Sequence, residues 1–425
     1  MSNLFELVLK QYEVAKKAFT TRRASLSVDG NDHDYYNIFN YLEFPKNEII
    51  IHYPIRMDDG TVRIMKGYRV QYNNVLGPYK GGIRISDDIY LDEIKSLAFW
   101  MTLKCALQEL PYGGGKGGIK VNPCTLSEKE LERVSKGYAS NMFKYIGENQ
   151  DIPAPDMGSN SQIMDWMTDA YQKKAQTHNN AVFTGKSIEC GGAAGREQAT
   201  GYGVVECVKL WANQNNLELA GKRYIIQGYG NVGSNTAVLL NRLGLICVGV
   251  ADHTKCIKSK EGFNVFQLMK HCQKHRNISE YPSGEEVDAD DFFSIECDIV
   301  IPAAKELVIC GDMASKMNCK VVVEAANGPV DMEAEYILQE KGIDVIPDIL
   351  ANSGGVVVSY YEWLQNKRCE YWCEEETLKK LSERIERIYN KVVNLSKTEN
   401  ISMRTACYVL AIEKIHKSVE NKGFY

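Results

Sequence analysis

Three lysines in this sequence stand in settings that suit a reaction centre. Lys116 lies in LPYGGGKGGIKVNP with five glycines around it, while Lys80 lies in GPYKGGIR and Lys104 in MTLKCAL. If the three converge, mutual repulsion and partial burial would lower the pKa of one of them. Such a lysine can act as a base, form a Schiff base or donate a hydrogen bond. The competing interpretation is that Lys80 and Lys104 are solvated surface charges.

The segment around Lys116 also superficially resembles a phosphate-binding P-loop. A P-loop carries Ser or Thr after its lysine to bind Mg²⁺, and Gly117 stands there instead. Leu110 occupies the position of the required leading glycine. Both departures argue against phosphate-loop chemistry at Lys116.

A carboxylate, Asp156, is a candidate proton carrier. It lies in DIPAPDMG, residues 151–158, where two prolines are expected to stiffen the loop that presents it. A positioned carboxylate beside cationic lysines suits proton transfer. An ordinary Asx turn or an N-cap before a predicted helix, Ser161–Tyr171, is the competing interpretation.

A glycine-rich turn indicates a dinucleotide site. Residues 224–234 read YIIQGYGNVGS, in which Gly228, Gly230 and Gly233 fit G-x-G-x-x-G between a predicted strand and a predicted helix, Ser234–Leu243. The first glycine permits a tight turn, the second lets the backbone approach a pyrophosphate, and the third permits close helix–strand packing. The helix N-terminus favours the phosphate charge.

The next predicted strand ends in an acid, Asp252. An acid at this place is expected to bind the adenosine ribose hydroxyls, and an N-cap without a ligand is the alternative. Because a carboxylate repels a 2′-phosphate, Asp252 favours NAD over NADP. His253 and Lys255 follow directly and could offset that preference.

The elements that must position these residues follow two patterns. After about residue 185, short apolar runs alternate with helical or loop segments, which favours a buried parallel sheet; the runs are Tyr224–Gln227, Leu245–Ala251, Asp298–Ile301 and Val321–Glu324. Elsewhere the sequence predicts strands at Glu48–Tyr53 and Ile64–Tyr72 and helices at Leu91–Leu110, Leu126–Tyr145, Val356–Asn366, Glu374–Ser396 and Arg404–Glu420.

These patterns predict an α/β protein of two domains. Residues 190–345 would form a Rossmann-type NAD(P)-binding domain. Residues 1–189 and 346–425 would form a discontinuous first domain.

Composition excludes several other classes of protein. The 425 residues are 44% hydrophobic and 25% charged with a net charge of −5, so nothing indicates binding to nucleic acid or to an anionic membrane. No apolar run approaches the roughly 20 residues of a membrane span. The 13 cysteines form no CxxC pair and indicate reduced thiols in the cytoplasm. A metal site at His271, Cys272 and His275 is conceivable, but a solvated helix face is favoured, and no metal is expected.

Taken together, the motifs resemble the glutamate/leucine/phenylalanine/valine dehydrogenase family over nearly the whole chain. LPYGGGKGGIKVNP is similar to the family's catalytic-lysine signature. The other matching segments follow in the family's order: GPYKGGIR, WMTLKCAL, DIPAPDMG, GREQATGYGV, GYGNVG, EAANGP and NSGGVVVSYYEW.

The resemblance implies a role for each matching position. Lys116 would polarise the substrate carbonyl and Asp156 would be the general acid/base. The substrate-binding set would be Lys80 and Ser359 at the γ-carboxylate, Lys104 at the α-carboxylate, Asn352 near the nicotinamide, and Arg196 and Met101 close by. Met101 stands where some members carry a glutamine. The dinucleotide set would be Thr200, Gly228, Gly230, Asn231, Val232, Gly233, Asp252, Ala303, Ala304 and Asn327.

The resemblance further implies reversible oxidative deamination of L-glutamate to 2-oxoglutarate and ammonium with NAD or NADP, in a homohexamer. It also implies that residues 1–189 and 346–425 form an α/β substrate-binding and oligomerisation domain, with an active-site cleft between it and the Rossmann-type domain. Hinges would lie near 185–200 and 346–356. In members that act on aliphatic amino acids, the positions of Lys80 and Ser359 are typically apolar. A lysine there would be left buried and unpaired by an aliphatic side chain, which favours glutamate. A dehydrogenase for another amino acid and a catalytically silent protein on this scaffold are the alternatives.

Overall fold

The computed structural model describes residues 4–26 and 33–423, which divide into two compact units. The Lys116 unit comprises Lys16–Arg196, Val356–Thr377 and Tyr408–Tyr425. The Gly228 unit comprises Met1–Ala15, Glu197–Gly355 and Leu378–Cys407. The functional domains predicted above, 1–189 with 346–425 and 190–345, stay a prediction.

The Lys116 unit is built on a five-stranded mixed sheet in the order β1-β2-β4-β3-β5. Its strands are β1 (Asn47–Arg56), β2 (Val62–Asn73), β3 (Tyr79–Ser86), β4 (Gly114–Lys120) and β5 (Asp151–Pro155). β3 pairs in parallel with both β4 and β5, whereas β2 pairs antiparallel with β1 and β4. The unit's helices, in whole or in part, are α1 (Leu4–Leu26), α2 (His33–Glu43), α3 (Leu91–Leu107), α4 (Glu128–Met142), α5 (Ser161–Ala175), α12 (Gly354–Arg368) and α14 (Met403–Lys422).

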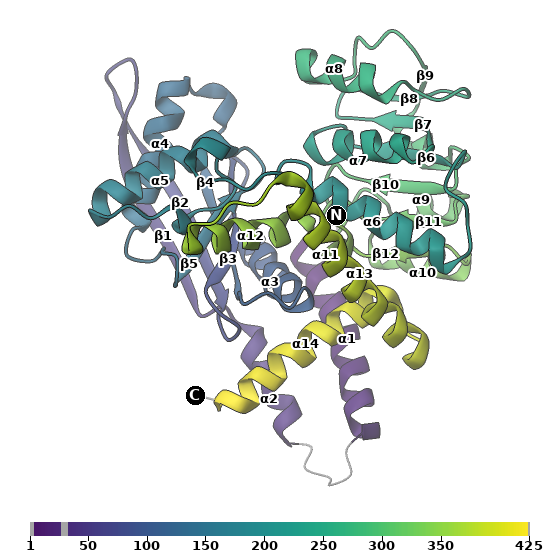
Figure 1. Cartoon of the computed structure of the whole chain (residues 1–425), viewed down its shortest axis with the longest axis horizontal. Coiled ribbons are helices and arrows are strands. Elements are labelled where there is room, and N and C mark those ends of the chain that lie inside the picture. Colours follow the sequence, from purple (N-terminus) through teal and green to yellow (C-terminus); the bar gives the residue numbers. More distant parts are fainter. Residues whose placement is uncertain (1–3, 27–32, 424–425) are drawn as a thin grey trace. The chain divides into compact units, whose positions relative to one another are not determined.

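The glycine-rich signature forms the central strand β4, because its neighbours leave no room for side chains. A Cβ on Gly114 would lie 2.3 Å from the backbone nitrogen of Thr102 in α3. On the other side of the sheet, α4 and α5 cover a core that includes Ile83, Ile119 and Tyr138 (Figure 1). Lys116 therefore lies on a rigid strand inside the fold.

The expectation that DIPAPDMG is a stiffened loop is wrong for its first half. Residues 151–155 form β5, an edge strand of the sheet. Proline is tolerated there because an edge strand has one side without a ladder partner. Asp156 directly follows this strand, so its backbone position is set by the sheet.

The Gly228 unit is built on a seven-stranded sheet in the order β12-β11-β10-β6-β7-β8-β9 (Figure 1). β12 to β7 run parallel, and β8 and β9 add an antiparallel edge. The strands are β6 (Arg223–Gln227), β7 (Ile246–Ala251), β8 (Cys256–Lys258), β9 (Glu285–Val287), β10 (Ile299–Pro302), β11 (Val321–Val323) and β12 (Asp344–Ile346). The helices are α6 (Ala199–Gln214), α7 (Asn231–Arg242), α8 (Val265–His275), α9 (Gly311–Lys316), α10 (Met332–Glu340), α11 (Asp348–Ala351) and most of α13 (Glu374–Glu399).

Alternation along β6 explains the layers of this sheet. Ile225 belongs to a core shared with α9 and α10. The next residue, Ile226, lies on the opposite face, where α7 packs closely enough to bring Gly233 near it. The predicted parallel α/β sheet and its four apolar strands are confirmed, and β8, β9 and β12 are additional.

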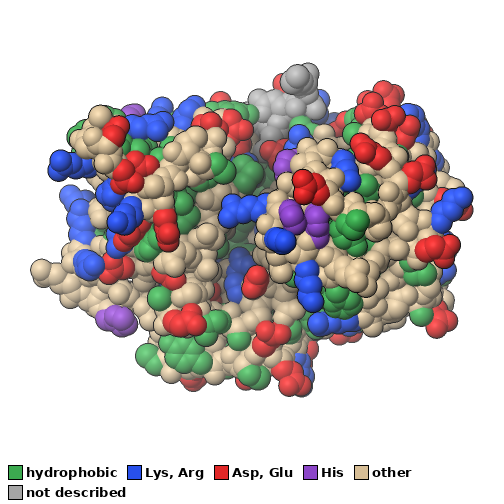
Figure 2. All heavy atoms as spheres, turned by 90° about the horizontal axis from the view of Figure 1, so that it is seen from above, with side chains coloured by type: hydrophobic (Ala, Val, Ile, Leu, Met, Phe, Trp, Pro, Cys, Tyr) green, Lys and Arg blue, Asp and Glu red, His purple; other side chains and the backbone are tan. Residues whose placement is uncertain are grey.

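Among the described residues, no helix is both long and apolar enough to span a membrane. On the face drawn in Figure 2, basic and acidic side chains are interspersed among the coloured atoms rather than gathered into areas of one sign.

Candidate active site

Lys116 and Asp156 form an ion pair in the Lys116 unit. Lys116 Nζ lies 3.0 Å from Asp156 Oδ2, and their side chains are 5% and 22% exposed. β3 runs between the two residues, and its Gly82 permits the approach, because a Cβ there would lie 2.7 Å from the Asp156 Cβ. Burial lowers the pKa of Lys116. Burial alone would raise the pKa of Asp156, but the charges of Lys116 and Arg84 lower it well below its usual range.

A second cation, Arg84, holds the same carboxylate. Its Nε donates to Asp156 Oδ2 over 3.1 Å, and its Nη1 lies 2.5 Å from Glu93 Oε1 in α3. The sequence analysis missed Arg84 and Glu93. The signal that points to Arg84 is strand alternation in GPYKGGIR, which places Lys80, Gly82 and Arg84 on one face.

Lys80 lies fully inside the unit, at 1% exposure. Burial lowers its pKa to about 7, and the charges of Arg69 and Arg196 also favour its neutral form. Within the described part of the chain it makes no hydrogen bond or ion pair. The interpretation of Lys80 as a solvated surface charge is therefore wrong, because its ammonium group has lost water and has no ion-pair partner among the described residues. The charge of Glu362 favours the ammonium form but does not offset the effect of burial.

Arg196 and Ser359 meet beside this lysine, with Arg196 Nε donating to Ser359 Oγ over 3.1 Å. Ser359 lies on α12, one helical turn before Glu362. Glu362 accepts from the backbone nitrogen of Gly185 at 2.7 Å and pairs with Lys186 Nζ at 2.6 Å, both groups being wholly buried. This pair fixes α12 to the segment at 183–187, and the sequence analysis missed it.

Lys104 lies on α3 at 7% exposure, so it too is not a solvated charge. Burial raises the pKa of Cys105 to about 12, and the charges of Lys80 and Lys104 both oppose that rise, which places the two lysines around one thiol. Met101 borders the same region, since its Cγ lies 3.4 Å from the position of a Cβ on Gly81.

Behind the lysines lies a buried ion pair of Arg69 with Asp151. Arg69 Nη1 also donates to the carbonyl oxygens of Gly81 and Gly82, the residues that follow Lys80. This arrangement ties β2, β3 and β5 together beneath the site. It was missed as well, because Arg69 and Asp151 lie far apart in the sequence.

The predicted dinucleotide residues gather at the carboxyl end of β6 in the Gly228 unit. Gly228 has φ +94°, and a Cβ there would lie 2.7 Å from Ala303 and Ala304. A Cβ on Gly233 would lie 1.9 Å from the carbonyl oxygen of Gly228, so helix and strand are in close contact. A Cβ on Gly230 would meet nothing within 4 Å, which leaves open space before the N-terminus of α7.

Three more of the predicted dinucleotide residues lie on or beside α7. Asn231 starts α7, and its Nδ2 donates to the carbonyl oxygen of Glu197 over 3.1 Å. Thr200 lies on α6, which packs against α7 through Gly201. Val232 belongs to the first turn of α7.

Asp252 directly follows β7, as predicted, but its carboxylate has local partners. Oδ1 accepts from the backbone nitrogen and hydroxyl of Thr254 and from the backbone nitrogen of Lys255. Oδ2 accepts from the backbone nitrogen of Ile278 over 2.8 Å. Asp252 thus fixes the loop after β7, and its contact with a ribose stays a prediction.

His271 and His275 stack with ring centroids 4.4 Å apart. Within 4–26 and 33–423, no group of three His, Cys, Asp or Glu residues could hold a metal ion.

Asn352 and Asn327 meet side by side. Asn352 Nδ2 donates to Asn327 Oδ1 over 3.0 Å and to the carbonyl oxygens of Ala325 and Ala326. Asn352 ends α11 and Asn327 lies in the loop after β11. The amide of Asn352 therefore sets the shape of this loop.

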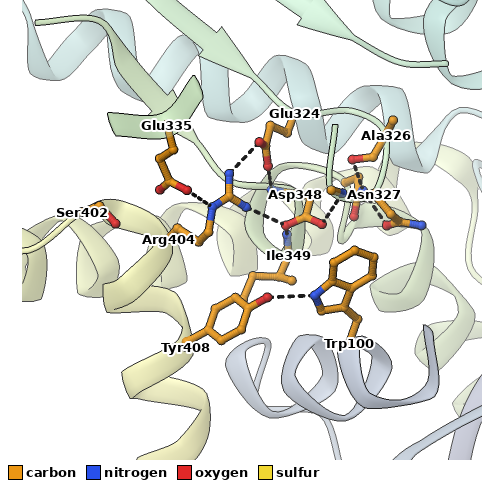
Figure 3. A network of polar contacts seen from close by, with 12 residues as sticks. Trp100, Glu324, Ala326, Asn327, Glu335, Asp348, Ile349, Ser402, Arg404 and Tyr408 are labelled. Carbon is orange, nitrogen blue, oxygen red and sulfur yellow. Dashed lines mark hydrogen bonds and ion pairs between the residues drawn. The ribbon is translucent and has the colours of Figure 1, made fainter. Parts of the chain in front are cut away.

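A buried network supports that loop (Figure 3). Arg404 pairs with Glu324 at 2.6 Å, Glu335 at 2.7 Å and Asp348 at 3.3 Å. Asp348 Oδ2 accepts from the backbone nitrogen of Gly328, next to Asn327. Burial raises the pKa of Glu324 to about 7, with Arg404 acting against that rise.

The chain combines a largely parallel, nucleotide-type sheet with a lysine–aspartate ion pair, and its relatives show that it is an amino-acid dehydrogenase. The sequence profile of the Glutamate/Leucine/Phenylalanine/Valine dehydrogenase family matches residues 191–423, and that of the Glu/Leu/Phe/Val dehydrogenase dimerisation domain matches residues 45–173. The chain belongs to this family, which confirms the resemblance inferred from its motifs.

Individual relatives agree. A protein of Thermotoga maritima named glutamate dehydrogenase is 41% identical over 97% of this chain and 98% of its own. A Clostridioides difficile protein named NAD-specific glutamate dehydrogenase is 39% identical over 91% of this chain and 93% of its own. A crystal structure of the hetero-hexameric glutamate dehydrogenase of Thermus thermophilus, in a leucine-bound form, has a TM-score of 0.92 at 33% identity and covers 99% of this chain and 97% of that one.

Proposed function

We propose that this chain is a glutamate dehydrogenase that interconverts L-glutamate with 2-oxoglutarate and ammonium, and that its preferred cofactor is NAD. The observation that carries the proposal is Lys80, which is 1% exposed and has no ion-pair partner among the described residues. A substrate with a second carboxylate supplies the missing charge, whereas an aliphatic side chain leaves it unpaired.

We assign the substrate contacts on that basis. Lys80, Ser359 and Arg196 bind the γ-carboxylate, which the adjacent Arg196–Ser359 hydrogen bond supports. Lys104 binds the α-carboxylate with Met101 beside it. Asn352 contacts the substrate near the nicotinamide.

The chemistry falls to Lys116 and Asp156. In the aminating direction, Lys116 donates to the carbonyl oxygen of 2-oxoglutarate and stabilises the negative charge that grows there as ammonia adds. Asp156 then transfers protons as the carbinolamine loses water. The low pKa of Lys116 suits this task, because a lysine that gives up its proton readily is a better acid.

The Gly228 unit fits a dinucleotide. The open space at Gly230 and the free N-terminal turn of α7 form a cradle that a side chain would fill. The residues that would hold the cofactor are Thr200, Gly228, Gly230, Asn231, Val232, Gly233, Asp252, Ala303, Ala304 and Asn327. When bound, NAD would supply the acceptor for the substrate hydride. The NAD-specific relatives support the choice of NAD over NADP.

We further propose that the protein is a homohexamer in the cytoplasm. The hexameric relative supports the copy number, although that relative contains more than one kind of chain. The mass of the purified protein in solution tests this directly, with six copies of one chain as the expected result.

Kinetic assays test the function. Purified protein should oxidise NADH in the presence of both 2-oxoglutarate and ammonium, and should form glutamate in equal amount. NADPH should support a lower kcat/KM. Equal or better turnover with NADPH would contradict the cofactor choice, and no turnover with either cofactor would favour a catalytically silent protein.

A further inference from the structure

We propose that Arg84 is a positioning residue for proton transfer: it holds Asp156 by Oδ2, so that Oδ1 is the oxygen that exchanges a proton with the substrate nitrogen. This inference deepens the proposed function and rests on the role given there to Asp156.

The two cations at Asp156 share one oxygen. Lys116 Nζ lies 3.0 Å and Arg84 Nε 3.1 Å from Oδ2. Within the ranges that the structure describes, no hydrogen bond reaches Oδ1, and the shortest contact of each cation is to Oδ2. The carboxylate is also partly exposed, at 22%. A proton on Oδ2 would face two cations, so Oδ1 is the oxygen that can accept one.

The backbone of Asp156 is held as firmly as its side chain. Its amide donates to Ser159 Oγ over 2.8 Å, and that hydroxyl donates to the carbonyl oxygen of Ile83 over 2.8 Å. Ile83 is the residue before Arg84 on β3. Backbone and carboxylate are thus fixed to one strand, and Oδ1 has a defined direction.

The planar fork of an arginine suits this place better than an ammonium group. Arg84 uses Nε for Asp156 and Nη1 for Glu93, so one rigid group fixes two carboxylates. Glu93 lies in the first turn of α3, where the helix dipole favours an anion. Glu93 is therefore fixed in place by helix α3. Glu93 in turn orients Arg84, and Arg84 orients Asp156.

Charges alternate along this row, from Glu93 through Arg84 and Asp156 to Lys116. Removing the charge of Arg84 takes a cation away from Asp156 and makes its carboxylate easier to protonate. Removing the charge of Glu93 leaves Asp156 as the acid in this row that pairs with Arg84. The carboxylate of Asp156 then becomes harder to protonate. The two changes therefore act on Asp156 in opposite directions.

The proton step balances without a further reactant. During deamination an N–H bond of the substrate breaks, an O–H bond forms at Oδ1, and the electron pair stays on nitrogen. Amination reverses the transfer. Arg84 gives up no proton in this step, because an arginine guanidinium stays protonated in proteins.

The test compares Arg84→Gln, Arg84→Lys and Glu93→Gln with wild type and with Arg133→Gln. Arg133 is a partly exposed arginine of the same unit that pairs with Asp58. kcat and KM for glutamate are measured across the pH range in which each protein stays folded. Arg84→Gln should lose about 10- to 100-fold in kcat, with KM for glutamate within about threefold, and the acid limb of kcat should move to higher pH.

Arg84→Lys keeps the positive charge but loses the planar guanidinium group. The acid limb of its kcat–pH profile should therefore stay near that of wild type, while its kcat should lie between those of Arg84→Gln and wild type. Glu93→Gln should show no upward movement of the limb, and Arg133→Gln should match wild type. If Arg84→Gln does not fold, the Arg84→Lys result decides: a wild-type kcat would overturn the proposal.

An Arg84→Gln enzyme with a wild-type pH profile would also overturn it, as would a loss confined to KM or limbs that move the same way in Arg84→Gln and Glu93→Gln. A different result would contradict the proposed function itself: neither wild type nor Arg133→Gln would turn over glutamate. If wild type is active and Asp156→Asn keeps full activity, Asp156 has no role in proton transfer, and this inference fails with it.

Discussion

Lys116 and Asp156 lie 3.0 Å apart across a strand to which neither belongs. Because β3 separates β4 from β5, the pair exists only when all three strands are in register. The glycine at position 82 makes the distance possible. The proposed reaction centre therefore depends on the packing of the sheet, and we expect single substitutions there to change activity without large changes in fold.

Lys116→Met should lower kcat for glutamate by roughly 10²–10³-fold, because it removes the donor that stabilises the developing oxyanion. KM should change little if the substrate carboxylates bind elsewhere. Steady-state kinetics in both directions measure the effect. Lys120→Met, on the exposed end of the same strand, serves as the control and should behave as wild type. Retention of more than about a tenth of kcat would contradict the role of Lys116.

Lys80→Leu, alone and with Ser359→Ala, should move substrate preference toward aliphatic amino acids. A charged hydrogen bond contributes about 1.5–3 kcal/mol, so kcat/KM for glutamate should fall by roughly 10- to 100-fold. kcat/KM for leucine should be higher in both variants than in wild type. Lys129→Leu, at an exposed position, is the control. An unchanged ratio of the two substrates would place the γ-carboxylate elsewhere.

Binding of a dicarboxylate should weaken as pH rises above about 7. Burial lowers the pKa of Lys80 to about 7, so its ammonium form, which pairs with a carboxylate, declines about tenfold per pH unit above that value. Calorimetry with glutarate in buffers of different ionisation enthalpy should detect proton uptake on binding at pH 8. Lys80→Leu should abolish the uptake. A wild-type affinity that stays flat between pH 7 and 9 would argue against a neutral Lys80 in the free enzyme.

Stability should respond to the network around Arg404. The pKa of Glu324 in the folded protein is about 7, above the roughly 4.3 of an unfolded glutamate. A raised pKa contributes stability that is complete below about pH 4.3 and is lost as pH rises through about 7, by at most a few kcal/mol. Glu335 raises the pKa of Glu324, so Glu335→Gln should show a smaller loss.

Thermal unfolding midpoints are measured at pH 5 and pH 8 for wild type and for Glu335→Gln. The change in midpoint between the two pH values should be smaller in the variant. Arg387→Gln on α13 leaves the network intact and should show the wild-type difference. An equal pH dependence in wild type and Glu335→Gln would mean that Glu324 does not titrate in this range.

The residues that sequence alone could place are those whose local pattern carries the information. The glycines at 228, 230 and 233 lie at the junction of β6 and α7, within eleven residues, and the close packing at Gly228 and Gly233 follows from their spacing. The helix begins at Asn231, three residues before the predicted start at Ser234. Apolar runs likewise predicted four of the five parallel strands, β6, β7, β10 and β11, since burial on both faces needs continuous apolar sequence.

The supporting residues could not be found in this way. Arg69 and Asp151 are ordinary charges until β2, β3, β4 and β5 bring them together. Arg404 lies 80 positions from Glu324, and nothing local marks either as buried. A charge can be recognised as buried only once its partner is known, so such pairs need the tertiary structure.

Lys80 is the residue that we propose selects a substrate with a second carboxylate. The most direct measurement compares kcat/KM for 2-oxoglutarate and 2-oxoisocaproate, each with NADH and ammonium, on the same preparation. The account predicts a preference for 2-oxoglutarate of at least about 10³-fold, as expected for a site whose buried charge stays unpaired with the wrong substrate. A preference for 2-oxoisocaproate would keep the fold and the Lys116–Asp156 chemistry but contradict the proposed substrate.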